Sequence, residues 1–227
     1  MSNMSAVEVR RVVMRLLCAR ALMDSPDLDL DLARTAMLLL DFQNYGLHPE
    51  GYWAKQGDPG WPSGAYPAVE NTARALEAAR SAGMLVVHVG ASWRPGSPEM
   101  NMHIPAFARG PDRSVEGTWG AKFYEPVSPV AGEIVVHKRS VSAFIGTELD
   151  RLFRVRDVST LVFTGVATNF AVEGSAREAA DRGYRAIVLA DCCASHPPDM
   201  HEFSIERILP ILCEVATANE FIAMLRR

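Results

Sequence analysis

The sequence has few cysteines, no long apolar run and no strong excess of either charge, and each absence argues against a class of protein. Four cysteines occur among 227 residues, without a C-x-x-C pair or a zinc-ligand spacing. No stretch approaches the roughly 20 apolar residues of a membrane-spanning helix. The net charge of −4 does not suit a polyanionic partner, since nucleic-acid-binding proteins concentrate Lys and Arg on one face. We therefore expect no nucleic acid and no membrane, but a small-molecule partner and a cytoplasmic location with free thiols.

The first 33 residues differ from the rest of the chain. Apolar residues recur at helical spacing between Val9 and Leu22, with arginines between them, which predicts an amphipathic helix. Residues 24–31 are acidic and contain a proline, as expected of a linker. We therefore divide the chain into an N-terminal extension and linker (residues 1–33) and one domain (residues 34–227), which is long enough to bury a substantial core.

From residue 35 onward, short apolar runs alternate with segments of helical periodicity. The runs predict strands at residues 35–41, 84–89, 133–137, 160–165, 185–190 and 214–216. The periodic segments predict helices at residues 69–82, 142–154, 168–182, 198–209 and 218–225. Strands separated by crossover helices form parallel sheets covered on both faces. The expected fold is therefore α/β, with three α/β/α layers and a mainly parallel six-stranded sheet.

Three positions far apart in the sequence are expected to meet at one edge of this sheet. Asp41 and Lys138 end the first and third strands, and Ala171 lies just beyond the fourth. The carboxyl ends of parallel strands form the ligand-binding edge of such folds. Two loops, 45–67 and 91–129, leave strand ends at the same edge and are too long for simple connections. We expect these loops to be lids, binding loops or subunit contacts.

The segments around these positions carry motifs. Asp41 opens D-F-Q-N, Lys138 opens K-x-x-x-S-A-F-x-G-T-x-L, and residues 165–173 read G-V-A-T-N-F-A-V-E. In this order they resemble the signatures of the isochorismatase-like cysteine hydrolases, and the resemblance covers residues 33–225. It implies a Rossmann-like fold of the class already expected. Ala171 stands where that family has its catalytic cysteine.

The resemblance also implies a role for each motif residue. Asp41 would act as general base and then general acid, and Lys138 would keep its carboxylate ionised and position the substrate. A non-proline cis peptide would join Val166 to Ala167. The backbone N–H groups of Ala167 and Ala171 would form an oxyanion hole, which does not need a thiol. On their own, Asp41 would be an ordinary loop-capping aspartate and Lys138 a surface lysine.

Further residues near these motifs are candidates for contact with the substrate. Each aromatic member is equally plausible as core or subunit-interface packing. The candidates are Gln43, Tyr45, Trp93, Trp119, Phe144, Asn169 and Phe170. The family's nicotinamidases bind a metal through a D-x-H segment and a further histidine after the second strand, but residues 90–95 lack this pattern. We therefore expect no metal and no cofactor.

Three functions remain open because Ala171 cannot attack a carbonyl. The first is a cysteine hydrolase of a small-molecule C–N bond (amide, ureido, carbamoyl or lactam) in which the cysteine has been replaced, either by design or by natural divergence. The second is a naturally thiol-free hydrolase of a C–N or C–O bond that uses Asp41 and water. The third is a non-catalytic binding homologue. We expect neither Cys192 nor Cys193 to replace the missing thiol, because buried structural thiols are far commoner. The resemblance further implies a homodimer or homotetramer.

Overall fold

A single parallel sheet organises the part of the chain described by the computed structural model, which covers residues 30–57, 60–108, 110 and 113–226. Six strands form this sheet in the order β3-β2-β1-β4-β5-β6, and every neighbouring pair is parallel. The strands are β1 Thr35–Leu40, β2 Leu85–Ala91, β3 Ile134–Lys138, β4 Thr160–Val166, β5 Arg185–Ala194 and β6 Glu214–Ala216. The predicted fold class is confirmed.

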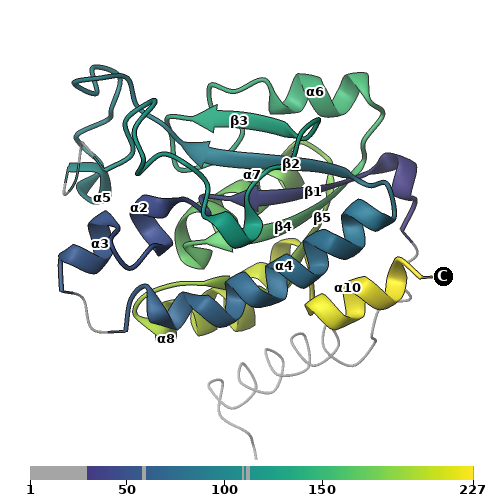
Figure 1. Cartoon of the computed structure of the whole chain (residues 1–227). Coiled ribbons are helices and arrows are strands. Elements are labelled where there is room, and N and C mark those ends of the chain that lie inside the picture. The colour runs from purple at the N-terminus through teal and green to yellow at the C-terminus, as the bar shows by residue number, and fades with distance from the viewer. Residues whose placement is uncertain (1–29, 58–59, 109, 111–112, 227) are drawn as a thin grey trace, which may run out of the picture.

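The continuous apolar runs of the strands are buried on both faces of the sheet. In β1, Met37 and Leu39 point into one hydrophobic cluster, whereas Leu38 and Leu40 point into the other. The first cluster is closed by α4 (Tyr66–Ser81) and α10 (Ala218–Met224), and the second by α6 (Leu149–Val155), α7 (Glu173–Asp181) and α9 (Leu209–Leu212). Alternating side chains of one strand thus pack against two helical layers. Figure 1 shows α4 and α10 together on one side of the sheet.

Short elements gather beyond the carboxyl ends of the strands. The helices α2, α3 and α5 lie on the side to which the arrowheads of β2 and β3 point (Figure 1). These helices are α2 Asn44–Leu47, α3 Tyr52–Lys55 and α5 Pro105–Ala108. The other short elements are η2 Ser63–Ala65, η3 Glu125–Val127, η4 Thr168–Val172, α8 Pro198–Phe203 and η5 Ser204–Ile208, whereas η1 Leu32–Arg34 directly precedes β1 at the opposite edge of the sheet (Figure 1). The two long loops predicted from the sequence therefore fold over the ligand-binding edge. None of the described helices is long and apolar enough to cross a membrane.

Three predicted helices differ from the structure. The helix expected at 142–154 begins only at Leu149, because hydroxyls of the preceding loop bind its backbone and Gly146 takes a left-handed φ of 72°. The helix expected at 168–182 opens with the π-helical turn η4, and the one expected at 198–209 is divided into α8, η5 and α9. Strand β5 continues to Ala194, past the predicted end at 190. The predicted helix at 9–22 lies outside the described residues.

Gly165, next to the end of β4, permits a close approach between the backbones of β4 and β1. It has a φ of 152°, and a Cβ atom there would lie 2.6 Å from the carbonyl oxygen of Leu40. Any side chain at this position would push β4 away from the end of β1. Because Gly165 has none, the turn after β4 lies directly beside Asp41, the residue that follows Leu40.

Candidate active site

A buried ion pair lies at the carboxyl ends of three adjacent strands. One carboxylate oxygen of Asp41 lies 2.8 Å from the Nζ atom of Lys138. The other accepts a hydrogen bond of 3.0 Å from the backbone N–H of Ala91, at the end of β2. Lys138 also donates to the carbonyl of Val141 at 2.7 Å. The sequence predicted that Asp41 and Lys138 would meet, and the structure brings them into contact.

The environment of Asp41 suits a group that takes up and releases a proton. Burial raises the pKa of Asp41 above its ordinary value of 3.8, while the charge and hydrogen bond of Lys138 lower it. The N–H of Ala91 and the charge of Arg113 act in the same direction as Lys138. Burial is the largest of these effects, so the pKa of Asp41 lies above its ordinary value and the carboxylate binds a proton more readily than an exposed aspartate.

The turn after β4 has the backbone expected of an oxyanion-binding segment. The peptide bond between Val166 and Ala167 is cis, as the family resemblance implied. The N–H groups of Phe170 and Val172 donate to the carbonyl of Ala167, at 3.2 and 3.3 Å, and hold the turn closed. Ala171 is buried in this turn, and its place at the nucleophile position stays what the family resemblance implies.

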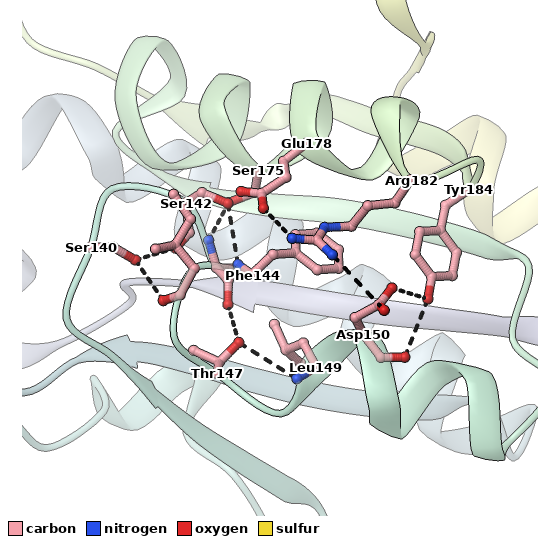
Figure 2. A network of polar contacts seen from close by, with 12 residues as sticks. Ser140, Ser142, Phe144, Thr147, Leu149, Asp150, Ser175, Glu178, Arg182 and Tyr184 are labelled. Atoms are coloured by element: carbon pink, nitrogen blue, oxygen red, sulfur yellow. Dashed lines mark hydrogen bonds and ion pairs between the residues drawn. The ribbon is translucent and has the colours of Figure 1, made fainter.

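Ser175, which the sequence analysis missed, connects this turn to the loop that follows Lys138. Its hydroxyl donates to the carbonyl of Ala171 at 2.6 Å and accepts from the N–H of Ala143 at 2.9 Å. Figure 2 shows how the loop is also braced by its own hydroxyls, among them those of Ser142 and Thr147. A small polar residue one turn into a helix is a common pattern, so nothing in the sequence singled Ser175 out.

Arg113 is the second residue that the sequence analysis missed. It is buried, and its guanidinium carbon lies 5.9 Å from the ring centres of Tyr45 and Trp53 and 5.7 Å from that of Phe107. Phe107 in turn contacts Phe170 of the turn, at 6.1 Å between ring centres. Burial raises the pKa of Tyr45, as does the charge of Asp41, so the phenol stays neutral. Arg113 and Phe107 thus connect Tyr45 with Phe170, and the contact of these two residues with a substrate stays a prediction.

Gln43 and Trp93 are buried inside the loops. The amide nitrogen of Gln43 donates to the carbonyls of Ala91 and Ala121, at 2.9 and 2.7 Å, and so ties two loop segments together. Trp93 is fully buried, with its ring 5.2 Å from that of Phe107. Its indole N–H has no hydrogen-bond partner among the described residues. Both side chains hold the loops at the carboxyl edge of the sheet together, and their contact with a substrate stays a prediction.

Phe144, Trp119 and Asn169 occupy three different environments. Phe144 lies in the core on the α6 and α7 side of the sheet, stacked on Tyr184, because its loop turns this ring toward the far end of α7 (Figure 2). The expectation that Phe144 lines the pocket is therefore wrong. Trp119 is 45 % exposed and packs edge-on against His48. Asn169, half-buried at the turn, accepts a hydrogen bond of 2.8 Å from Ser195.

The cysteines at the end of β5 are not substitutes for the missing nucleophile. Cys192 and Cys193 are both buried. Burial raises the pKa of Cys192 and brings that of Cys193 to about 12, so both thiols stay protonated and unreactive. Within the described residues, no group of three or more His, Cys, Asp or Glu side chains is arranged to hold a metal ion.

The strand order, the motif order and the placement of Asp41, Lys138 and the turn at 165–173 agree with a known family. A model of the isochorismatase domain matches residues 35–220. The chain belongs to the isochorismatase family. This membership identifies it as a hydrolase, in line with the resemblance noted in its sequence.

Two curated relatives of this isochorismatase-family chain are amidohydrolases. One, from Methylobacterium radiotolerans, is named ureidoacrylate amidohydrolase RutB and is 35 % identical over 196 residues, covering 79 % of this chain and 74 % of the relative. The other, from Pseudomonas putida, is named maleamate amidohydrolase and is 33 % identical over 202 residues, covering 85 % and 87 %. A crystal structure of a cysteine hydrolase from Pseudomonas syringae pv. phaseolicola shares the fold, with a TM-score of 0.80, 24 % identity and coverage of 90 % and 99 %.

Proposed function

We propose that this protein hydrolyses the C–N bond of a small amide or ureide. The contact of 2.8 Å between Asp41 and Lys138, buried beside the turn at 165–173, is the observation that carries the proposal. It supplies a proton acceptor next to a cis-peptide turn suited to binding a carbonyl oxygen. The names of the relatives from M. radiotolerans and P. putida support the choice of an amide or ureido bond.

Water replaces the thiol as nucleophile in the chemistry we propose for this sequence. The water oxygen attacks the carbonyl carbon while Asp41 takes one of its protons. The carbonyl oxygen gains the negative charge of the tetrahedral intermediate, which the N–H groups of Ala167 and Ala171 stabilise. The C–N bond then breaks, its electron pair stays on nitrogen, and Asp41 returns the proton to that nitrogen. An amide gives a carboxylate and ammonia. A ureide gives an amine and a carbamate, and the carbamate breaks down in water to bicarbonate and ammonia.

Lys138 acts in this scheme by holding a positive charge against Asp41. It favours the ionised carboxylate in the resting site, so that Asp41 is ready to accept a proton. Once Asp41 is protonated, the ion pair is lost, which favours release of the proton to the leaving nitrogen.

The test is ammonia release from maleamate, 3-ureidoacrylate and nicotinamide by the full chain and by its A171C and D41N variants. We expect ammonia from the parent chain and a faster reaction for A171C, because a thiol adds a covalent route. The D41N variant should lose about 10²- to 10⁴-fold in kcat, the usual contribution of a general base. Circular dichroism of each variant controls for folding.

Two results would contradict the proposal. If neither the parent nor A171C releases ammonia from any of these compounds, the protein is not a C–N hydrolase of this kind. If D41N retains the parent's rate, Asp41 is not the proton carrier. Ala171, which has no nucleophilic atom, favours a second function, that of a non-catalytic binding protein. In that case, calorimetry should show that the parent binds these compounds, and the ammonia assay should show no turnover.

A further inference from the structure

Arg113 is a buried cation that has no anionic partner in the part of the chain that the structure describes. No carboxylate of those residues lies within 4.0 Å of its guanidinium nitrogens, whereas Arg80, Arg139 and Arg185 each pair with a glutamate. One nitrogen, Nη1, donates to the carbonyls of Phe107 and Gly110, at 3.2 and 2.7 Å. The phenol oxygen of Tyr45 also interacts with the guanidinium as a hydrogen-bond partner. A guanidinium has five N–H donors, so these three contacts still leave donors for an anionic acceptor.

Burying a positive charge without an anion is unfavourable, so its retention calls for an explanation. Aromatic rings provide part of it. The rings of Tyr45, Trp53 and Phe107 lie around the guanidinium within 5.9 Å and stabilise it through their electron-rich faces. Rings and carbonyls hold the arginine in one orientation, but they do not neutralise its charge.

The position of Arg113 relates it to the reacting groups. Phe107, which contacts the guanidinium, also contacts Phe170 of the turn at 165–173. Tyr45 follows Asp41 by four residues and lies under the same guanidinium. The charge of Arg113 is also close enough to lower the pKa of Asp41. The cation is therefore fixed next to the proton carrier, on the side formed by the loop at 91–129.

We propose that Arg113 binds a carboxylate of the substrate, at the end away from the C–N bond that is cleaved. This inference rests on the proposed function and adds the class of substrate, a small amide or ureide that is also a carboxylic acid. A planar guanidinium matches a carboxylate with two parallel hydrogen bonds, which a neutral amide group cannot accept in the same way. The aromatic walls exclude water and so strengthen the ion pair.

The test compares maleamate with maleamide, its neutral analogue in which the carboxylate is replaced by a second carboxamide. Binding is measured by calorimetry, and ammonia release where turnover is seen, for the parent chain and for R113Q, R113K and R94Q. Arg94 lies exposed in the same long loop, so R94Q is a matched control for the loss of one positive charge. Circular dichroism and thermal unfolding report whether each variant folds.

We expect the parent to bind maleamate at least about tenfold more tightly than maleamide. R113Q should weaken maleamate binding by about 10- to 100-fold, in keeping with the loss of charge-assisted hydrogen bonds, and maleamide binding by less than about threefold. R113K should fall between R113Q and the parent, because it keeps the charge but loses the two-pronged contact. R94Q should behave as the parent.

The proposal is overturned if the parent binds maleamide as tightly as maleamate, a comparison that needs no variant. It is also overturned if a folded R113Q or R113K binds maleamate as the parent does. Failure of the proposed function gives a different result. If maleamate binds through Arg113 but no ammonia is released even by A171C, the carboxylate site stands and C–N hydrolysis does not.

Discussion

At the scale of single residues, the pairing of Asp41 with Lys138 sets the pH range in which the site can work. Burial pushes the pKa of Asp41 upward from 3.8 and Lys138 pushes it down. A general base must be ionised, so activity falls as the pH drops through the pKa of Asp41. Under the proposed function, the ion pair thus extends the pH range of activity toward acid.

Removing the ammonium group of Lys138 should narrow the pH range in which the site is active. In Lys138→Met, burial acts on Asp41 without its main opposing charge, so its pKa rises further. We expect the acidic limb of kcat/KM to move to higher pH. The measurement is the pH profile of ammonia release, together with a ¹³C NMR titration of the Asp41 carboxyl group.

Lys138→Arg is the matched control. Because it keeps a cation, the acidic limb of its pH profile should lie near that of the parent. A limb that stays in place or moves to lower pH in Lys138→Met would show that the lysine does not govern the ionisation of Asp41.

Residues at strand ends were predictable, and residues in long loops were not. Asp41 and Lys138 each end an apolar run, so the topology of a parallel sheet brings them to the same edge. Arg113 lies inside the loop at 91–129, whose path depends on contacts far apart in the sequence, and no local pattern marked it. Phe144 was misplaced because one turn of an irregular loop decides which way its ring faces.

At the scale of secondary-structure elements, the loop after β3 and the helix α7 form one unit. Ser175 joins them through two hydrogen bonds, to Ala143 of the loop and Ala171 of the turn. The loop contains Val141, whose carbonyl accepts from Lys138. The position of the lysine therefore depends on a hydroxyl on a different element.

Ser175→Ala should loosen this unit. The N–H of Ala143 would be left buried without an acceptor, which costs about 1–3 kcal/mol. We expect the free energy of unfolding, measured by urea denaturation, to fall by about this amount, with a lower kcat in the ammonia assay. Ser140→Ala is the control, since Ser140 bonds only to carbonyls of its own loop, and it should cost less. Equal stability of the two variants would contradict the role given to Ser175.

The strands and most helices could be predicted from periodicity, but the boundaries next to the site could not. The helix at Leu149 begins late because Ser142 and Thr147 bind the backbone of the preceding loop in place of helical hydrogen bonds. The helix after β4 begins with a π-helical turn, which is set by the geometry of the turn and not by the spacing of apolar residues.

At the scale of the whole molecule, the amphipathic segment at 9–22 and the expected homodimer or homotetramer remain predictions, since that segment lies outside the described residues. Its apolar stripe includes Val13 and Leu17, and its polar positions include Arg15 and Arg20. A stripe of this kind needs a partner surface, which a second copy of the chain would offer.

Placing charges on the stripe should weaken association. We expect the double variant Val13→Glu, Leu17→Glu to sediment as a smaller species than the parent in analytical ultracentrifugation. The double variant Arg15→Gln, Arg20→Gln is the control, and it should sediment as the parent. If both variants behave as the parent does, the segment is not an oligomer contact.

The missing side chain at Gly165 has a consequence for directed evolution of this scaffold. Because a Cβ atom there would meet the carbonyl of Leu40 at 2.6 Å, the spacing between the proton carrier and the oxyanion turn tolerates no variation at this position. The close contact at Gly165 does not constrain the loops at 45–67 and 91–129. A mutant library that keeps Gly165, together with Ala91, Tyr45 and Arg113, which contact Asp41 or affect its ionisation, can therefore diversify the rest of those loops without disturbing the pair of Asp41 and Lys138.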